Sequence, residues 1–245
     1  MHGEHSSYTL LIHHIGMATA PTLYRRLPYS PQRDFVPIGR IADAPMIVMT
    51  RRHLIPPGIA FPDYVRANQP TLMLGYAGAG SASQLCGLLL QESLGVHLMW
   101  LPYRGTRPAM RDLRDGRIDL LCDQSTQAIP AIQAAEAEPY CLTAPNRLAI
   151  IDRIPTAAES GFNAINISIW HGLYSARGTD PAIVDRLARA LNEAVGSPAF
   201  EAAMTAVGVT VTPAAERSAG ALREHMARET RRWAPLIRRS GMYAD

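Results

Sequence analysis

The sequence contains no lysine: all 24 of its basic residues are arginine. A lysine amine forms the Schiff base of pyridoxal-phosphate enzymes and binds phosphate in Walker-type loops, so both chemistries are excluded. Arginine stays protonated in proteins and does not replace lysine as a nucleophile or a tunable base. The composition therefore excludes every enzyme class that depends on a reactive amine side chain.

Long apolar runs and cysteine are also scarce. No stretch approaches the ~18 consecutive apolar residues of a membrane span, and the longest buried-looking run, residues 85–90, contains a glycine. The three cysteines, Cys86, Cys122 and Cys141, show no CxxC spacing. Their odd number argues against a full disulfide framework and leaves a single bridge open.

Charge is nearly balanced, with 24 basic and 21 acidic residues and a net charge of +3. The basic run at residues 228–239 is interpreted as the solvated face of a helix, so we expect no nucleic-acid partner. Hydrophobic residues make up 47% of the chain. That fraction is typical of globular proteins, and the length suits one large domain or two small ones.

The order of predicted elements favours an α/β protein. Strands are predicted at 8–12, 45–49, 72–77, 97–103, 117–123 and 140–143. Helices are predicted at 81–94, ended by Gly95, from Thr106 as a candidate N-cap to about 116, and at 126–135. Residues 21–35 are rich in turn signals, and 56–58 are predicted to be a linker. Strands alternating with helices after residue 72 indicate a mostly parallel sheet covered on both faces.

The last third has a different pattern. Residues 165–176 form one extended stretch that is long enough to cross between two domains. Asp180 and Pro181 are a good helix start, and 209–211 are predicted to be a strand. Leu222, Met226 and Ile237 recur at helical spacing and predict a final amphipathic helix.

A glycine-rich turn, 78–84, is the most informative local feature. It stands between a predicted strand and a predicted helix, where glycines permit close backbone approach and the first helical N–H groups can bind an anion. Hydroxyls of Ser81 and Ser83 would add donors. A plain tight turn with a serine cap is the structural alternative. A dinucleotide site is disfavoured because the GxGxxG spacing is incomplete and no acidic residue follows about 20 positions later.

Asp123 follows a buried strand, at the end where ligands collect in open α/β sheets. It is a candidate to bind a ligand amine, hydroxyl or bridging water. Helix capping by Asp123, Ser125 or Thr126 is the structural alternative, and the two roles are compatible. Trp170 is interpreted either as a wall of a ligand cleft or as a core aromatic.

Metal binding and nucleophilic catalysis are both disfavoured. Adjacent side chains on an extended segment point in opposite directions, so His13 and His14 are not expected to chelate one ion. No cysteine or serine has a nucleophile-elbow context, and Cys86 falls inside an apolar helix.

An ordered series of motifs gives a family resemblance. These include YTLL at 8–11, LYRRLPY at 23–29, GSASQLCG at 80–87, PYRG at 102–105, CDQ at 122–124, IPTAAESG at 154–161, WHGLY at 170–174 and RWAP at 232–235. The chain resembles the solute receptors of tripartite tricarboxylate transporters, the Bug proteins, over nearly its whole length.

The resemblance implies a two-domain, periplasmic-binding-protein-like flytrap fold. One α/β domain would combine 1–49 with 173–245, and the other would span 50–172. The two would close on a small mono- or dicarboxylate in the cleft between them, without a cofactor, metal or catalysis, and pass it to transporter membrane subunits. The ligand-binding residues implied are His14, Gly16, Gly80, Ser81, Ala82, Ser83, Gln84, Tyr103, Asp123, Gln124, Ser125 and Trp170.

The chain departs from the family pattern at its start. Family members have an export signal, a strand, a glycine-rich loop, a helix and a second strand before the equivalent of Tyr8, and no signal peptide is predicted here. The interpretations are a late start site, a shortened chain or a gene remnant. We expect the first domain to lack its N-terminal strands and helix, to expose an apolar edge and to bind ligand weakly or not at all.

Two further functions remain as alternatives. A cytoplasmic ligand-sensing domain would fit the absent signal, whereas the family resemblance implies a periplasmic location. An α/β enzyme such as a hydrolase, with His14 or His171 as the base, is the catalytic alternative.

Overall fold

The computed structural model describes residues 9–241, 243 and 244, and these divide into two compact units. Unit 1 comprises Met1–Asp43 and Ile169–Asp245, and unit 2 comprises Ala44–Ser168. The chain passes between them within strands β2 (Phe35–Thr50) and β7 (Ser168–Ala176). The predicted domain boundaries, between residues 49 and 50 and between residues 172 and 173, fall within the same two strands. The assignment of the two units as separate domains stays a prediction.

The strands of unit 1 are mainly antiparallel. Strand β1 (Leu10–His14) pairs with β7, from Leu10 opposite Ser175 to His14 opposite His171. The other neighbour of β7 is β2, and β8 (Thr210–Val211) pairs with β2 at Ala42. The predicted strand at 8–12 is present but begins later, and Tyr8 lies outside the described residues.

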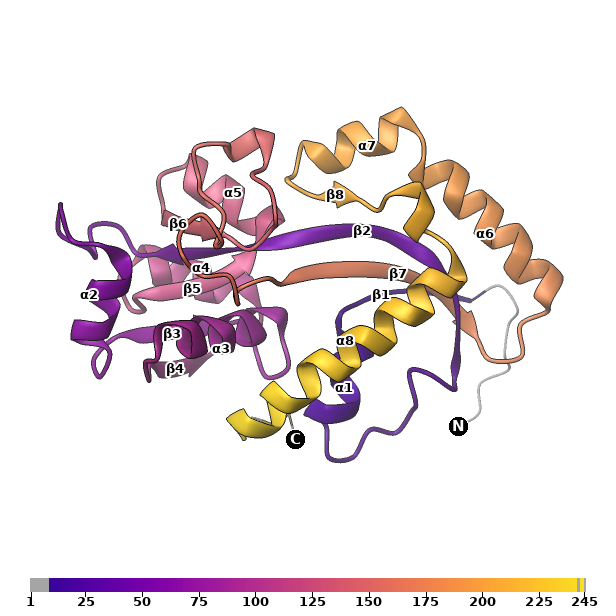
Figure 1. Cartoon of the computed structure of the whole chain (residues 1–245), viewed down its shortest axis with the longest axis horizontal. Coiled ribbons are helices and arrows are strands. Elements are labelled where there is room, and N and C mark those ends of the chain that lie inside the picture. Colours follow the sequence, from indigo (N-terminus) through magenta and orange to yellow (C-terminus); the bar gives the residue numbers. More distant parts are fainter. Residues whose placement is uncertain (1–8, 242, 245) are drawn as a thin grey trace. The chain divides into compact units, whose positions relative to one another are not determined.

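The helices of unit 1 are α1 (Gly16–Leu23), α6 (Pro181–Val195), α7 (Pro198–Thr205) and α8 (Ala219–Ser240), with a 3₁₀ turn at Ala214–Glu216. Helix α8 lies over α1 (Figure 1) and buries Leu222, Met226 and Trp233. The prediction of irregular structure from residue 21 is wrong at its start, because Pro21 lies inside α1. Burial of that helix against α8 outweighs the local turn signal.

Unit 1 exposes apolar side chains on strand β1. Among the described residues β1 ends the path of paired strands, and the side chains of Leu10 and Ile12 are 41% and 62% exposed. That this edge results from missing N-terminal strands stays a prediction. Along α6 only Val195 is buried. Isolated exposed apolar side chains are ordinary, but two on one edge strand are a site where another strand can pair.

Unit 2 contains the mixed sheet. Its strands are ordered β6 (Glu138–Leu142), β2, β5 (Leu120–Gln124), β3 (Met73–Tyr76) and β4 (Met99–Pro102). Strands β3, β4 and β5 are parallel, and β2 runs antiparallel to both β5 and β6. The prediction of a mostly parallel sheet is therefore confirmed, with β2 as the reversed strand.

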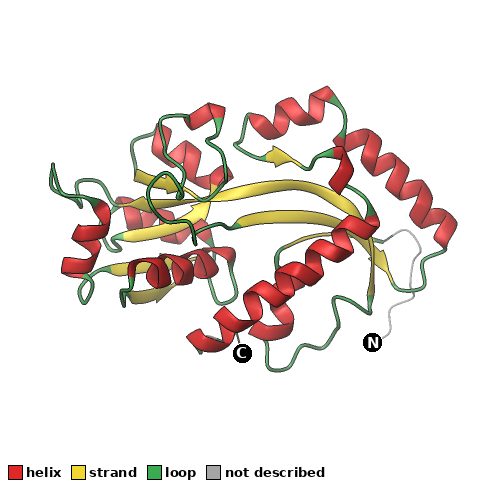
Figure 2. Ribbon diagram, in the orientation of Figure 1, coloured by secondary structure: helices red, strands yellow, loops and turns green. Residues whose placement is uncertain are grey.

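Helices α2 (Phe61–Asn68), α3 (Ala82–Leu94), α4 (Thr106–Arg114) and α5 (Ser125–Gln133) pack around these strands (Figure 2). Ser81 caps α3 by accepting from the Gln84 N–H at 3.2 Å, which is the structural alternative that the sequence left open for this turn. Gly95 ends the helix in the left-handed conformation, as the sequence predicted. One apolar cluster, including Ile47, Leu113, Leu121 and Ile129, fills the core. A 3₁₀ turn, Ala149–Ile151, completes the elements of this unit.

Candidate functional site

Three helices of unit 2 begin where three neighbouring parallel strands end. Strands β3, β4 and β5 lead into α3, α4 and α5 through short connections. We define residues 77–84, 103–106 and 123–125 as the strand-end site. Hydrogen bonds join its parts: Gly105 N–H donates to Ala77 O (3.2 Å) and Thr106 Oγ1 donates to Asp123 Oδ1 (3.3 Å). Ser83 Oγ also donates to the carbonyl oxygen of Cys122, at the end of β5 (2.6 Å).

The turn before α3 depends on glycine. Gly78 and Gly80 have φ values of 114° and 76°, which side chains other than glycine adopt only under strain. A Cβ at Gly78 would lie 3.2 Å from the carbonyl oxygen of Tyr103. The buried Gln84 side chain accepts from Gly80 N–H at 2.7 Å and so fixes the turn.

The start of α3 offers backbone donors. The N–H groups of Ala82 and Ser83 have no acceptor within the part of the chain that the structure describes, as is usual for the first turn of a helix. These groups and the helix dipole favour a bound anion. The Ser83 hydroxyl, expected to donate to a ligand, instead donates to Cys122 O, because the helix packs directly on β5. The Ser81 hydroxyl oxygen is occupied by its cap, and its proton is still available.

Asp123 is the buried acid of the strand-end site. It is 3% exposed, and its Oδ1 accepts from Gln124 N–H at 2.8 Å and from Thr106 Oγ1 at 3.3 Å. Burial raises the pKa of Asp123 to about 6, although the hydrogen bonds from Gln124 and Thr106 oppose the shift. The carboxyl group therefore changes its charge close to neutral pH.

Two buried oxygen atoms of this site have unused hydrogen-bonding capacity. Asp123 Oδ2 and Ser125 Oγ have no partner among the residues that the structure describes. Buried polar side chains nearly always have a partner, so such atoms indicate where a ligand or a water molecule completes the site. Both lie within three consecutive residues at the end of β5.

Two predictions about helix caps near Asp123 are wrong. Thr106 is the first residue of α4 rather than its cap, which is Gly105, and its hydroxyl donates to Asp123. Helix α5 has Gln124 at its cap position with no side-chain cap bond, so Asp123, Ser125 and Thr126 do not cap it. Thr106 is a residue of the site that the sequence did not suggest, because its contact with Asp123 joins two separate loops.

Tyr103 is positioned by α4. Its hydroxyl donates to Asp112 Oδ2 at 2.8 Å, and Asp112 also accepts from Arg117 at 2.6 Å. Burial, followed by the hydrogen bond to Asp112, raises the pKa of Tyr103 to about 12. The phenol is thus committed to this cluster, and contact between Tyr103 and a ligand stays a prediction.

His14 and Gly16 lie in unit 1, at the junction of β1 and α1. The expectation that His13 and His14 point to opposite sides is wrong, because their ring centroids are 4.6 Å apart. The strand ends here, and each ring accepts from a following backbone N–H: His14 N to His13 Nδ1 at 2.9 Å and Gly16 N to His14 Nδ1 at 3.1 Å. A Cβ at Gly16 would lie 2.8 Å from Cε1 of the His13 ring, so a larger residue here would require that ring to shift.

The histidines of this junction are poor candidates for a charged or metal site. Loss of hydration, followed by the nearby charges of His13 and His171, lowers the pKa of His14 to about 4. His14 is therefore neutral at physiological pH. Within the ranges that the structure describes, no three His, Cys, Asp or Glu side chains are arranged to hold a metal ion.

Trp170 is a core residue of unit 1. It is 1% exposed, and its ring meets that of His225 edge to face at a centroid distance of 4.9 Å. Of the two roles that the sequence left open, the structure shows the packing role. Contact between Trp170 and a ligand stays a prediction.

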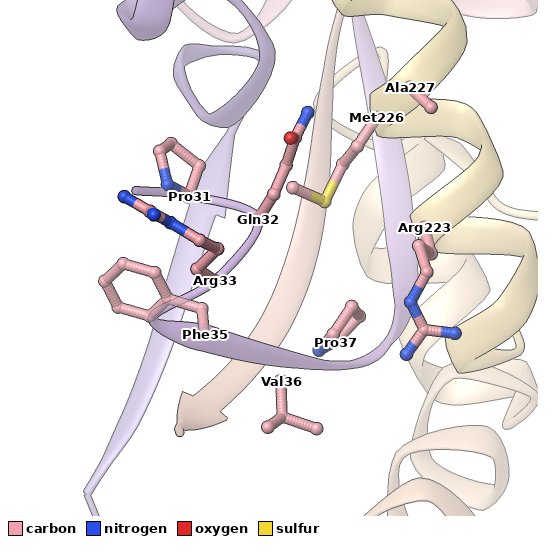
Figure 3. Close-up of a pocket in the computed structure, with 9 residues that line it drawn as sticks. All are labelled: Pro31, Gln32, Arg33, Phe35, Val36, Pro37, Arg223, Met226 and Ala227. Carbon is pink, nitrogen blue, oxygen red and sulfur yellow. The ribbon is translucent and has the colours of Figure 1, made fainter. Parts of the chain in front are cut away.

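A surface pocket of about 470 Å³ lies within unit 1 (Figure 3). Its lining combines two arginines with apolar side chains: Pro31, Gln32, Arg33, Phe35, Val36, Pro37, Arg223, Met226 and Ala227. None of the ligand-binding residues expected from the sequence lines this pocket. The strand-end site in unit 2 is therefore the stronger candidate for the ligand site. It combines backbone N–H donors at a helix start with buried oxygens that have no partner among the described residues.

The two α/β units and the strand-end site define a solute-binding protein with the fold of periplasmic binding proteins. The chain belongs to the tripartite tricarboxylate transporter family receptors, since the model of that family matches residues 4–242.

Relatives and solved structures agree with this assignment. A protein of Agrobacterium vitis from the TAR-I ttuE-ttuC' intergenic region is 36% identical over 96% of this chain and 68% of its own length. The structure of the periplasmic binding protein BugD is 35% identical, with a TM-score of 0.88 over 99% of this chain and 81% of that one. MatC of Rhodopseudomonas palustris, with bound malate, is 30% identical, with a TM-score of 0.85 over 96% and 81%.

One further finding concerns membranes. No helix in the described ranges combines the length and the apolar character that crossing a bilayer requires.

Proposed function

We propose that this chain captures a small organic carboxylate as the extracytoplasmic receptor of a tripartite tricarboxylate-type transporter, without catalysis. The observation that carries the proposal is the strand-end site, where backbone N–H groups at the start of α3 are combined with buried oxygens that lack a partner. The family membership and the malate bound to MatC support a carboxylate ligand.

The start of α3 is proposed to bind one ligand carboxylate. The N–H groups of Ala82 and Ser83 and the proton of the Ser81 hydroxyl are donors, which suit an oxygen anion and not a cation. Gly80 and Gln84 act through the shape of the turn, because their hydrogen bond holds it. Contributions from His14, Gly16, Tyr103 and Trp170 stay predictions.

Asp123, Gln124 and Ser125 are proposed to bind the rest of the ligand. With a pKa of about 6, the Asp123 carboxyl group is mostly neutral at pH 5 and mostly ionised at pH 7. The neutral form can donate a hydrogen bond to a second carboxylate of the ligand. The ionised form repels that carboxylate and accepts a hydrogen bond from a ligand hydroxyl or a water molecule. We therefore propose that dicarboxylates bind more tightly below pH 6. A hydroxyl group on the ligand should make its affinity depend less on pH, because ionised Asp123 can accept a hydrogen bond from it.

The test is a calorimetric titration of the purified protein with malate and, as an uncharged analogue of the same shape, with malamide. We expect heat of binding for malate alone, since the α3 donors require an anion. Ser81→Ala should weaken malate binding about tenfold, because it removes both a donor and the helix cap.

Ser218→Ala is the matched control. Ser218 caps α8 in unit 1 through Ala221 N–H at 3.1 Å, so the control should lose similar stability and keep malate affinity. Equal loss of affinity in both variants, or equal affinity for malate and malamide, would contradict the proposed site.

The location and the partners belong to the same proposal. The periplasmic binding protein BugD supports a periplasmic place of action. Membership of a transporter receptor family supports membrane subunits as partners. A cytoplasmic sensing domain would bind the same class of ligand. Restored uptake of a labelled dicarboxylate, when the receptor is returned to cells that retain only the membrane subunits, would distinguish the transport role.

A further inference from the structure

Two of the three cysteines meet beneath the strand-end site. The Sγ atoms of Cys86, on α3, and Cys122, on β5, are 2.6 Å apart, and both residues are fully buried. That separation lies between a disulfide bond of about 2.05 Å and van der Waals contact at about 3.5–4.0 Å. The two thiols therefore lie where a small local movement joins them.

The surrounding contacts fix this pairing. The Ser83 hydroxyl donates to the carbonyl oxygen of Cys122, and Cys86 follows one helical turn later, on the same face of α3. Cys86 and Cys122 thus face each other across one helix–strand contact inside unit 2.

Cys141 lies close by but is not placed to bridge Cys122. Val48 of β2 is opposite Cys122 on one side and Cys141 on the other. Adjacent strands lie about 4.8 Å apart, so a whole strand separates these two cysteines by about 10 Å, beyond the ~7 Å limit for bridging Cα atoms. Cys141 is therefore a natural internal control.

We propose that Cys86 and Cys122 are a disulfide-forming pair, oxidised by thiol–disulfide exchange with a small-molecule or protein disulfide. The thiolate of one cysteine attacks the oxidant disulfide, forms a mixed disulfide and releases one thiol. The second cysteine, as its thiolate, attacks the protein sulfur of that mixed disulfide, which forms the Cys86–Cys122 bond and releases the second thiol. The protein loses two protons and two electrons, and the oxidant is reduced to two thiols.

Burial determines when the bond forms. In the folded protein both sulfurs are inaccessible, and burial raises the pKa of Cys122 so that little thiolate exists. Exchange needs an accessible thiolate. The bond therefore forms while unit 2 is folding, and it is afterwards protected from reductants in the native state.

The bond would tie α3 to β5. Its consequence for ligand binding rests on the proposed function, because the two elements carry the anion-binding turn and Asp123. The formation of the bond does not depend on that function. A negative thiol count would therefore contradict only the disulfide, and a negative binding titration would contradict only the proposed function.

The experiment counts thiols. Protein unfolded with reductant is refolded in reduced and oxidised glutathione or in dithiothreitol, denatured, and alkylated with iodoacetamide before intact mass measurement. We expect one alkylated cysteine after oxidative refolding and three after reductive refolding, with a Cys86–Cys122 peptide in the unreduced digest. Closing this loop of about 37 residues should raise the melting temperature by about 10 °C.

Matched variants exclude other pairings. Cys141→Ala should still form the bond and leave no alkylated thiol, whereas Cys86→Ala should show two alkylated thiols under both conditions. Protein exported into an oxidising compartment and purified without reductant provides the same count independently of refolding yield. Three free thiols in the oxidised preparations, or a bond that contains Cys141, would overturn the proposal.

Discussion

At the scale of single residues, the strand-end site depends on groups whose environment changes their chemistry. Asp123 is an ordinary acid in sequence, but in the fold it is buried, with one oxygen bonded and the other without a partner among the described residues. The hydroxyls of Ser83 and Thr106 bond within the fold, and each joins a helix start to β5. Ser83 donates to the carbonyl oxygen of Cys122, and Thr106 donates to the side chain of Asp123. Each of these assignments depends on contacts between loops that are distant in sequence.

The first prediction concerns Asp123→Asn. Burial raises the pKa of Asp123 from its ordinary value of 3.8 to about 6, so the folded protein binds this proton more tightly than the unfolded chain. The associated stability is fully present below pH 3.8 and is lost as the pH rises through 6. Asparagine stays neutral, so at pH 8 the variant should be more stable than the native protein by up to about 3 kcal/mol.

Denaturant unfolding at pH 4 and pH 8 measures this difference. At pH 4 the two proteins should differ by less than about 1 kcal/mol, because Asp123 is protonated in almost all folded molecules and is only partly ionised in the unfolded chain. A variant that is less stable at pH 8 would show that ionised Asp123 is stabilised by its surroundings.

At the scale of elements, the bounds of helix α3 were predicted almost to the residue, whereas helix α1 and the length of strand β2 were not. Ser81 and Gly95 are local signals, because a cap and a left-handed terminus need only neighbouring backbone. Helix α1 was not predicted, because Pro21 lies within it and its stability comes from burial against α8. The length of β2, 16 residues, was also not predicted, because it depends on pairing with several separate strands.

The second prediction compares two helical glycines. Gly87 lies in the middle of α3, where a Cβ would be 2.7 Å from both Leu74 Cδ2 and the ring of Trp100. Gly87→Ala should therefore destabilise the protein by about 1–3 kcal/mol despite the better helix propensity of alanine. Gly220, exposed near the start of α8, has only Ser218 Oγ within 4 Å, at 3.8 Å, so Gly220→Ala should be neutral or slightly stabilising.

Urea midpoints of the two variants and the native protein provide the measurement. If Gly87→Ala unfolds at the native midpoint, the close packing of α3 on β3 and β4 is wrong. A loss at Gly220 as large as that at Gly87 would mean that general helix effects, and not packing, determine both values.

At the scale of the whole molecule, the proposed receptor binds its ligand and returns it unchanged. A ligand that binds only the folded state raises the free energy of unfolding by about 2.7 kcal/mol at 100 times its dissociation constant. We expect thermal unfolding with malate to shift upward with the logarithm of its concentration, and malamide to give no shift. Chromatography after long incubation should recover malate intact, and a product lost in His171→Ala would instead establish an enzyme.

The sequence by itself determined the α/β class, the family and the glycine terminus of α3. It left the serine cap of α3 as an alternative, which the structure shows, and anion binding at the turn 78–84 stays a prediction. These properties reside in short-range patterns of hydrophobic spacing, glycine and caps. Only the tertiary structure decided that Ser83 is bonded to Cys122 O, that Asp123 is buried with an unpaired oxygen, that Trp170 packs in a core, and that Cys86 meets Cys122 while Cys141 does not. Burial and hydrogen bonding between distant segments depend on how helices pack on strands, which no local pattern records.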